Sequence, residues 1–212
     1  MGVKCLNKYL KKKVKSGIRP IHLNELKGKT IAIDTSIYLY EFNIDDQLIY
    51  NFIKMLNILN KFDITPIFVF DGPPPKEKLL CFKNNKNITQ TNKDDSNSNK
   101  ITKEKRNQVI SLLKTNNIKY IKSKSEGEKT CGKLVKNHNV DGCFTNDTDI
   151  FMYGVNKVYR NFNLKTNIVD EYTLTTILKE LSITYDIFKI ICILAGTDYN
   201  KTIIDIFKAF KI

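Results

Sequence analysis

The chain has little of what marks a membrane, secreted or zinc-binding protein. No hydrophobic run approaches the roughly 20 residues that a membrane-spanning helix needs, and the basic N-terminus lacks the apolar core of a signal peptide. The five cysteines are scattered and none forms a C-x-x-C pair, so a reducing compartment is expected and a disulfide framework is not. The two histidines, His22 and His138, lack metal-ligand spacing and are interpreted as surface or packing residues.

Positive charge, by contrast, is abundant. The 212 residues include 35 Lys and Arg against 22 Asp and Glu, which gives a net charge of +13. Such a charge without membrane features favours a polyanionic partner, most commonly nucleic acid. Apolar residues recur at helical spacing over 6–14, and Lys11, Lys12 and Lys13 lie on the polar side. These lysines are either a phosphate-contacting surface or a solvated helix face.

Strand-like and helix-like segments alternate along the chain. Buried strands are predicted at 30–33, 66–70, 118–121, 140–145 and 155–162. Helices are predicted within 1–29 and at 45–62, 103–113, 125–137, 174–181 and 186–195. This alternation predicts an α/β fold with a mainly parallel central sheet flanked by helices. The segment 83–100 is almost devoid of apolar residues and is expected to be a mobile, lysine-bearing loop.

Acidic residues follow the predicted strands. Asp34 and Asp71 end the first two apolar runs, and Asp147 and Asp149 follow the strand near Val140. Loops and helix starts add three further acids, Glu126, Glu128 and Asp198. Ligands of open parallel sheets bind at the carboxyl ends of the strands, so these seven carboxylates are expected to converge on one rim.

Seven carboxylates in one cleft repel each other unless cations neutralise them. Magnesium prefers such oxygen ligands, and two ions roughly 3.5–4 Å apart are an established arrangement for phosphodiester cleavage. Each acid also has a purely structural alternative. An Asp after a strand is often a turn former, Ser125-x-x-Glu128 fits a helix capping box, and Asp147-Thr148-Asp149 fits an Asx turn. Asp45 or Asp46 is expected to cap the helix at 45–62.

Several segments together resemble the flap endonucleases and related structure-specific 5′ nucleases of the xeroderma pigmentosum group G type. The segments are Met1-Gly2-Val3, IAIDTSIYLY (31–40), PIFVFDGPPPKEK (66–78), SEGEKTCGKL (125–134), DGCFTNDTDIFMYG (141–154), VYRNF (158–162) and CILAGTDY (192–199). The resemblance implies a PIN-like 5′ nuclease domain over 1–212. Its parts would be an N-terminal nuclease region (1–82), an arch loop (83–100), an internal nuclease region (101–199) and a truncated helix-two-turn-helix (200–212).

The resemblance also implies roles for particular residues. The seven acids match the family's metal carboxylates, which hold two Mg²⁺ ions for which Mn²⁺ can substitute. Lys78 matches a basic residue over the scissile phosphate, Tyr40 an aromatic that stacks near an unpaired nucleotide, and Gly2 a small residue near the active site that is exposed once Met1 is removed. The alternatives are a solvated loop charge for Lys78 and ordinary packing for Tyr40. The candidate nucleic-acid contacts are Lys11, Lys12, Lys13, Lys83, Lys86 and Arg160.

Some positions depart from the family pattern. The family has alanine at the positions of Gly127 and Lys129, so the helix there is expected to be weaker and to carry an added charge beside the metals. The second basic position of the arch is Asn85. Asp205 and Phe207 stand where the family has glycines that let the backbone approach duplex phosphates, so a weaker grip on the duplex is expected. No sliding-clamp motif is visible.

The expected function is therefore a magnesium-dependent 5′ nuclease acting on flapped or branched DNA in replication, repair or recombination. A monomer is expected, located inside the cell in the nucleus or in a viral replication compartment, without a membrane partner. The alternatives are a catalytically weak or inactive DNA-binding relative and a ribonuclease on a PIN-like sheet. A phosphatase with an aspartyl nucleophile is disfavoured because Asp34-Thr35-Ser36 lacks a second Asp two residues on.

Overall fold

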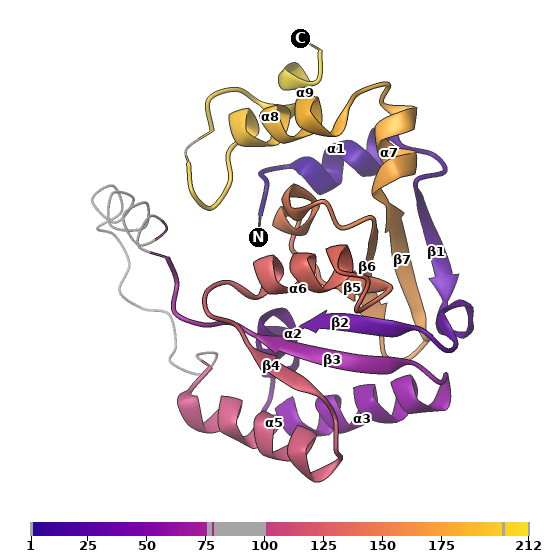
Figure 1. Cartoon of the computed structure of the whole chain (residues 1–212), viewed down its shortest axis with the longest axis vertical. Helices are drawn as coiled ribbons and strands as arrows, with labels where there is room; N and C mark the ends of the chain where they lie inside the picture. Colours follow the sequence, from indigo (N-terminus) through magenta and orange to yellow (C-terminus); the bar gives the residue numbers. More distant parts are fainter. Residues whose placement is uncertain (1, 76–77, 79–100, 201, 212) are drawn as a thin grey trace.

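A seven-stranded sheet organises the chain (Figure 1). The computed structural model describes residues 2–75, 78, 101–200 and 202–211. The strands are β1 (Ile18–His22), β2 (Thr30–Asp34), β3 (Thr65–Phe70), β4 (Tyr120–Lys122), β5 (Gly142–Phe144), β6 (Lys157–Asn163) and β7 (Ile168–Thr173). Their order across the sheet is β1-β7-β6-β5-β2-β3-β4.

Five neighbouring strands, β6, β5, β2, β3 and β4, run parallel, and β7 and β1 add two antiparallel pairings at one edge. The predicted mainly parallel α/β sheet is confirmed. The edge pair β1 and β7 is not among the predicted strands. β1 has Pro20 at its centre and exposes Arg19 and Pro20, so its pattern is not that of a buried strand, and proline is tolerated there because the strand lies at an edge.

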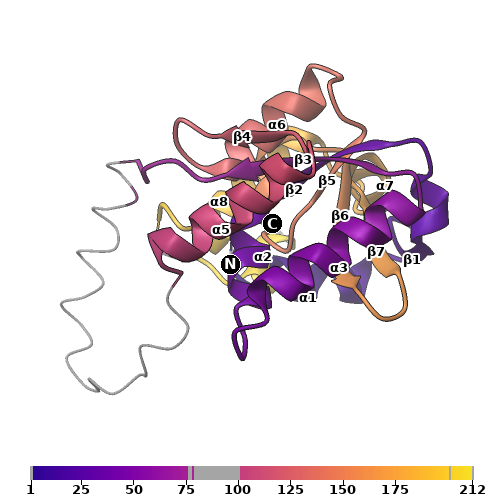
Figure 2. The ribbon, with the colours of Figure 1, turned by 90° about the horizontal axis from the view of Figure 1, so that it is seen from below.

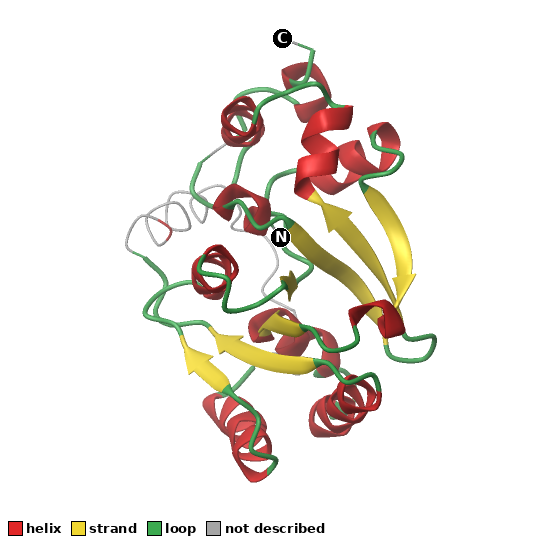
Figure 3. Cartoon of the chain, turned by 45° about the vertical axis from the view of Figure 1, so that its right-hand side comes forward, coloured by secondary structure: helices red, strands yellow, loops and turns green. Residues whose placement is uncertain are grey.

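Helices cover both faces of the sheet (Figures 1 and 3). On one face lie α2 (Thr35–Phe42), α3 (Leu48–Lys61) and α5 (Lys103–Thr115), whose apolar residues share one hydrophobic core with the sheet. Figure 2 shows α3 and α5 in front of the sheet. On the other face lie α1 (Leu6–Lys13), α6 (Gly127–Lys136), α7 (Leu174–Glu180), α8 (Tyr185–Ala195) and α9 (Ile206–Ala209), around a second core. Short 3₁₀ helices, η1 (Leu23–Leu26) and η3 (Asp149–Tyr153), complete the described elements.

The predicted helices are confirmed to within a few residues, but the capping expectation for α3 is wrong. Gln47, and not Asp45 or Asp46, is the N-cap of α3, and it makes no side-chain bond there. Both aspartates have positive φ angles and form the turn before the helix. None of the described helices is long and apolar enough to span a membrane.

The two positions that depart from the family's C-terminal glycines have structural roles. The side chain of Asp205 caps α9 by accepting the Phe207 amide, 2.9 Å away. The Phe207 ring packs edge-on against Tyr9 of α1, with ring centroids 5.3 Å apart. These residues attach the C-terminal turn to α1. The segment 83–100, predicted as an arch loop and containing Asn85, lies outside the described residues.

The central strands align the acidic residues that follow them. β2 pairs with β3 on one side and with β5 on the other, all parallel, so their carboxyl ends share one rim. Asp34 is the last residue of β2, and Asp71 immediately follows β3. The turn after β5 carries Asp147, and Asp149 begins η3. The rim therefore collects the acids of three neighbouring strands.

Candidate active site

A cavity of about 210 Å³ lies at this rim and is called the acidic pocket here. Six of the predicted carboxylates line it: Asp34, Asp71, Glu126, Glu128, Asp147 and Asp198. The seventh, Asp149, adjoins them, because its amide donates to Asp147 Oδ1 across 2.9 Å. Tyr40 and Lys78 complete the functional part of the lining. Residues as far apart in sequence as 34 and 198 are thus brought to one place.

The first two acids are held by hydrogen bonds from neighbouring segments. Asp34 is 1% exposed, and its Oδ2 accepts from the Thr145 hydroxyl at 2.8 Å. Asp71 Oδ1 accepts the amide of Gly127, the first residue of α6, at 2.6 Å. A Cβ on Gly127 would lie 2.9 Å from Asp71 Oδ1. Gly127 begins the helix and permits this close approach. The destabilisation that glycine causes inside a helix therefore does not apply at this position.

The structural alternatives for the acids are decided one by one. Glu126 is the N-cap of α6 and makes no side-chain bond there, so the capping box of Ser125 and Glu128 does not form, and Glu128 lines the pocket. The Asx turn does form, since Asp147 accepts the Asp149 amide. That bond uses one oxygen of Asp147 and orients the turn toward the pocket. Lys129 is exposed and is not among the residues that line the pocket.

Burial and mutual repulsion raise the pKa values of several acids. The pKa of Asp34 is raised to about 7 by burial and by the charge of Asp71. Burial and Asp34 raise the pKa of Glu128 to about 9, and burial and Asp147 raise that of Asp149 to about 7. Burial also raises the pKa of Asp147. Ionising all of these carboxylates without a cation is therefore unfavourable, and positive charge bound in the pocket would stabilise their ionised forms.

One cation of the chain already enters this cluster. The Lys78 ammonium lies 2.7 Å from Glu126 Oε1 and 2.8 Å from Asp198 Oδ2. Burial lowers the pKa of Lys78, but the hydrogen bonds and charges of Asp198 and Glu126 outweigh it and raise the pKa overall. The Tyr199 hydroxyl also donates to Glu126. Lys78 shows that a positive group fits among these carboxylates.

The donor set fits a hard divalent cation in its chemistry. Its potential ligands are all carboxylate oxygens, and Asp34 Oδ1 and Asp149 Oδ1 are buried with no hydrogen-bond partner. Orphaned buried oxygens of this kind are uncommon unless they serve an ion or a reaction. As the side chains stand in residues 2–75, 78, 101–200 and 202–211, no three acids, cysteines or histidines converge closely enough to hold one ion.

The other predicted residues lie in different surroundings. Tyr40 is 59% exposed at the pocket, where its ring is free to stack. Gly2 packs against the Asp147 turn so closely that a Cβ would lie 2.1 Å from Asp147 Oδ1. Lys11, Lys12 and Lys13 are all exposed, and the Lys11 ammonium pairs with Asp170 at 3.0 Å.

The remaining predicted nucleic-acid contacts are Lys83, Lys86 and Arg160. Lys83 and Lys86 lie outside the described residues. Arg160 is 5% exposed, so it offers no open surface to a nucleic acid and can be reached only within a cavity. His22 is a packing residue as interpreted: Nδ1 accepts the Asn24 amide, and the ring packs edge-on against Phe62.

Four supporting residues escaped the sequence interpretation. The Thr145 hydroxyl bonds Asp34, and the Tyr199 hydroxyl bonds Glu126. Both residues stand inside the quoted segments and within two positions of an acid, which is the signal that could have found them. Arg106 Nη2 donates to the carbonyl of Asp71 at 2.5 Å, and Asn146 Nδ2 donates to Glu41 Oε1 at 2.5 Å. Arg106 has no local signal because only the fold brings α5 to the end of β3.

Known protein families and individual relatives match the sequence of this chain. The XPG N-terminal domain matches residues 1–92, and the XPG I-region matches residues 117–198. Flap endonuclease 1 of Encephalitozoon cuniculi is 31% identical over 241 residues, which cover 96% of this chain and 69% of that protein. Flap endonuclease GEN homolog 1 of Mus musculus is 31% identical over 196 residues, but these are 84% of this chain and only 21% of that protein.

Solved structures agree with the sequence matches. The catalytic core of Rad2 in complex with DNA substrate superposes with a TM-score of 0.86 at 28% identity, covering 99% of this chain and 67% of that chain. Human GEN1 in complex with Holliday junction DNA superposes with a TM-score of 0.74 at 27% identity, covering all of this chain and 55% of that chain. The chain thus spans from about a fifth to about two thirds of the proteins that it matches.

Proposed function

Because the chain belongs to the XPG-type flap endonuclease family, we propose that it is a magnesium-dependent, structure-specific 5′ nuclease acting on flapped or branched DNA. The observation that carries the proposal is the acidic pocket: six carboxylates from distant segments surround one cavity in a chain whose net charge is +13. A basic chain has no folding reason to gather self-repelling acids at its strand ends. Phosphodiester hydrolysis supplies such a reason.

Each part of the pocket has a task in that reaction. A pair of divalent cations supplies the Lewis-acid activation of water and the charge neutralisation that phosphodiester hydrolysis needs. The carboxylates of Asp34, Asp71, Asp147 and Asp149 would hold these ions, together with Glu126, Glu128 and Asp198. Lys78 contributes positive charge for the phosphate oxygens, which raises the stability of the charged transition state. In-line attack of water leaves a 5′-phosphate and a 3′-hydroxyl.

Exposed aromatic and basic residues would bind the strand. The exposed Tyr40 ring offers a stacking surface for a frayed base, an interaction of about 1–3 kcal/mol per base. The exposed lysines of α1, Lys11 to Lys13, add phosphate contacts whose contribution falls with rising salt. We further propose that the protein acts as a monomer within the cell, in the nucleus or in a viral replication compartment.

A cleavage assay tests the proposal directly. A labelled 5′-flap DNA is incubated with the protein in increasing Mg²⁺, beside matched single-strand, duplex and RNA-flap substrates. Asp147→Ala and Asp149→Ala are expected to abolish cleavage while flap binding stays nearly unchanged, because these acids line or adjoin the acidic pocket and not the outer surface.

Four results would contradict the proposal. Cleavage that is equal with and without divalent cations would remove the metal requirement. Activity of either variant equal to that of the wild type would remove the assigned residues. Flap binding by the wild type without any cleavage would favour the inactive DNA-binding relative, and a preference for the RNA flap would favour the ribonuclease.

A further inference from the structure

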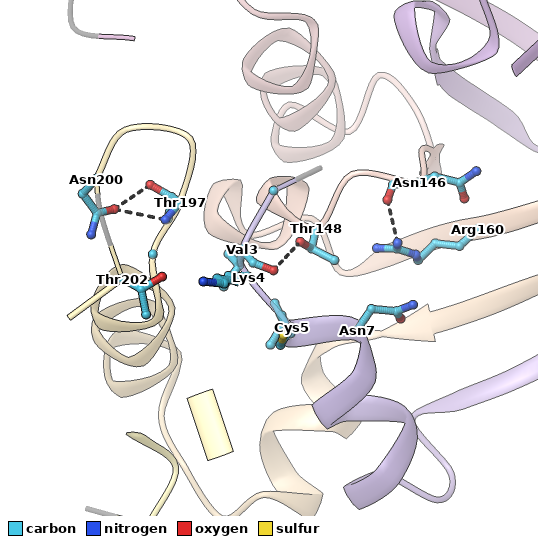
Figure 4. Close-up of a pocket in the computed structure, with 13 residues that line it drawn as sticks. Val3, Lys4, Cys5, Asn7, Asn146, Thr148, Arg160, Thr197, Asn200 and Thr202 are labelled. Carbon is cyan, nitrogen blue, oxygen red and sulfur yellow. Dashed lines mark hydrogen bonds between the residues drawn. The ribbon is translucent and has the colours of Figure 1, made fainter. Parts of the chain in front are cut away.

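A second cavity adjoins the acidic pocket (Figure 4). It has a volume of about 560 Å³ and is called the N-terminal pocket here, because residues 2–7 form much of its wall. Gly2 links the two cavities: it lines the N-terminal pocket, and its Cα packs against Asp147, which lines the acidic pocket. The proposed function makes no use of this cavity.

The lining of the N-terminal pocket is polar and basic. Its only charged side chains are Lys4 and Arg160, and no Asp or Glu is among the lining residues that the structure describes. The remaining polar side chains are amides and hydroxyls: Asn7, Asn146, Thr148, Thr197, Asn200 and Thr202. Such a lining accepts a negatively charged oxygen ligand without any carboxylate to repel it.

Arg160 is buried without enough acceptors. Its Nη2 donates to the carbonyl of Asn146 at 2.6 Å, and its guanidinium carbon lies 5.5 Å from the centre of the Tyr172 ring. Nε and Nη1 are buried with no hydrogen-bond partner. No ion pair joins Arg160 to a carboxylate in the described part of the chain, although Asp147 and Asp170 lie near enough to act on its charge. In Figure 4 the guanidinium points from β6 toward Thr148 and the N-terminal segment.

The first turn of α1 contributes a second source of positive potential. Residues 3–7 line the cavity and include the start of this eight-residue helix. Cys5, its N-cap, has a φ of 58° and gives no side-chain bond, and the first turn contains no acid. The positive end of the helix dipole favours an anion at such a position.

We propose that the N-terminal pocket binds a phosphate group, held by Arg160, Lys4 and the first turn of α1. A planar guanidinium with unpaired N–H groups, a flexible ammonium and a helix start together are complementary to the oxygens of a phosphate ester. The phosphate belongs either to a nucleic-acid strand that also enters the acidic pocket or to a free phosphate ester. The first of these two sources rests on the proposed function; the phosphate site itself does not.

Calorimetric titration with inorganic phosphate tests the site. The protein is kept in EDTA, so that phosphate cannot bind through metal ions and no cleavage occurs. Lys4→Ala is expected to weaken phosphate binding by about tenfold, the loss of one hydrogen bond to a charged group. Lys8→Ala is the matched control, because Lys8 is exposed on the same helix and does not line the cavity. Equal phosphate affinity of the two variants would overturn the proposal.

Arg160→Lys provides a second measurement. It keeps the charge but removes the fork of donors, so phosphate binding is expected to weaken by at least as much as in Lys4→Ala. A thermal melt of this variant shows beforehand that the buried position still folds. If Arg160→Lys does not fold, the comparison of Lys4→Ala with Lys8→Ala still decides the question.

A short single-stranded oligonucleotide, titrated in the same buffer, identifies the source of the phosphate. If Lys4→Ala weakens the binding of both phosphate and oligonucleotide, the site takes a strand phosphate. If it weakens phosphate alone, the site takes a free phosphate ester. A protein that fails to cleave flap DNA but binds phosphate in a Lys4-dependent manner would refute the proposed function and leave this site intact.

Discussion

The acidic pocket and the N-terminal pocket are neighbours with opposite chemistry. Six carboxylates line the first, whereas Lys4 and Arg160 are the only charged side chains of the second. Yet the same short stretch after β5 serves both, since Asp147 lines one cavity and Asn146 and Thr148 line the other. Alternation of side chains along one turn therefore presents an acid to the first cavity and uncharged polar groups to the second.

Both cavities contain buried polar atoms that the fold leaves without partners. In the acidic cluster these are Asp34 Oδ1 and Asp149 Oδ1, and beside the N-terminal pocket they are Arg160 Nε and Nη1. Buried groups without partners cost stability, so few persist unless a ligand or a reaction uses them. The difference in sign indicates different ligands: cations for the first cavity and an anion for the second. A phosphodiester substrate needs both beside each other.

Gly2→Ala is the largest expected disturbance of this arrangement, because it acts on the wall between the cavities. The added Cβ would lie 2.1 Å from Asp147 Oδ1, 2.6 Å from the Thr148 hydroxyl and 2.7 Å from the Asp149 amide. Gly2 also has a φ of 84°, which other residues rarely adopt. Displacing the turn by about 1 Å is expected to lower kcat/KM on flap DNA by about a hundredfold.

Gly28→Ala is the matched control for that experiment. Gly28 has a φ of 73°, so its substitution introduces the same backbone strain, but a Cβ there would meet nothing within 4 Å. A small loss of melting temperature and unchanged cleavage are expected. Equal loss of cleavage in both variants would show that strain, and not the approach to Asp147, governs the effect.

The fold was largely predictable from the sequence because its central strands are buried. The runs at 30–33 and 66–70 are continuous apolar segments, and the structure places them as β2 and β3. The antiparallel strands β1 and β7, at one side of the sheet, were not predictable in this way. Their residues alternate irregularly between burial and exposure, and their pairing joins segments about 150 residues apart, such as Ile21 with Val169.

The site was predictable in its acids and less so in its surroundings. An acid directly after a buried parallel strand must lie at the carboxyl rim, which is a rule of chain geometry and holds for Asp34 and Asp71. The supporting bonds depend on tertiary packing instead. Arg106 reaches Asp71 only because α5 packs beside β3, and the burial of Arg160 could not be inferred from its charge.

Glu128→Gln tests whether the acids of the acidic pocket are held under repulsion. The folded pKa of Glu128 is raised to about 9 by burial and Asp34, above its ordinary 4.5. The folded protein therefore holds a proton that the unfolded chain releases, and the free energy of unfolding falls as pH rises from about 4.5 to 9. In EDTA the variant is expected to lose the part of this decline that is due to Glu128, while Asp34 and Asp149 keep theirs. It is expected to melt higher than wild type at pH 8, by about 2–4 °C for each kcal/mol recovered.

Thermal melts in Mg²⁺ extend the comparison of wild type with Glu128→Gln. Bound cations stabilise the folded wild type, so its melting temperature is expected to rise with Mg²⁺ concentration, and that of Glu128→Gln is expected to rise less. Glu25→Gln, at an exposed acid of η1, is expected to show neither effect. If Glu128→Gln melted lower than wild type in EDTA at pH 8, the carboxylate would be a stabilising group and the repulsion argument would be wrong.

Glu180 is a carboxylate outside both cavities, and its substitution is expected to have the smallest effect on stability of the changes considered. It accepts the amides of Lys15, Ser16 and Gly17 at 2.6–3.0 Å and the Ser16 hydroxyl at 2.8 Å. These bonds, that of Lys15 first, lower the pKa of Glu180 to about 2. Its stabilising effect is therefore complete above pH 4.5 and is lost as pH falls toward 2, the reverse of Glu128.

Thermal melts from pH 2 to 6 test this effect. The melting temperature of Glu180→Gln is expected to lie slightly below that of wild type at pH 6 and to become equal to it near pH 2. A difference in melting temperature between the two proteins that stays constant from pH 2 to 6 would contradict this prediction. It would show that ionisation of Glu180 does not contribute to stability.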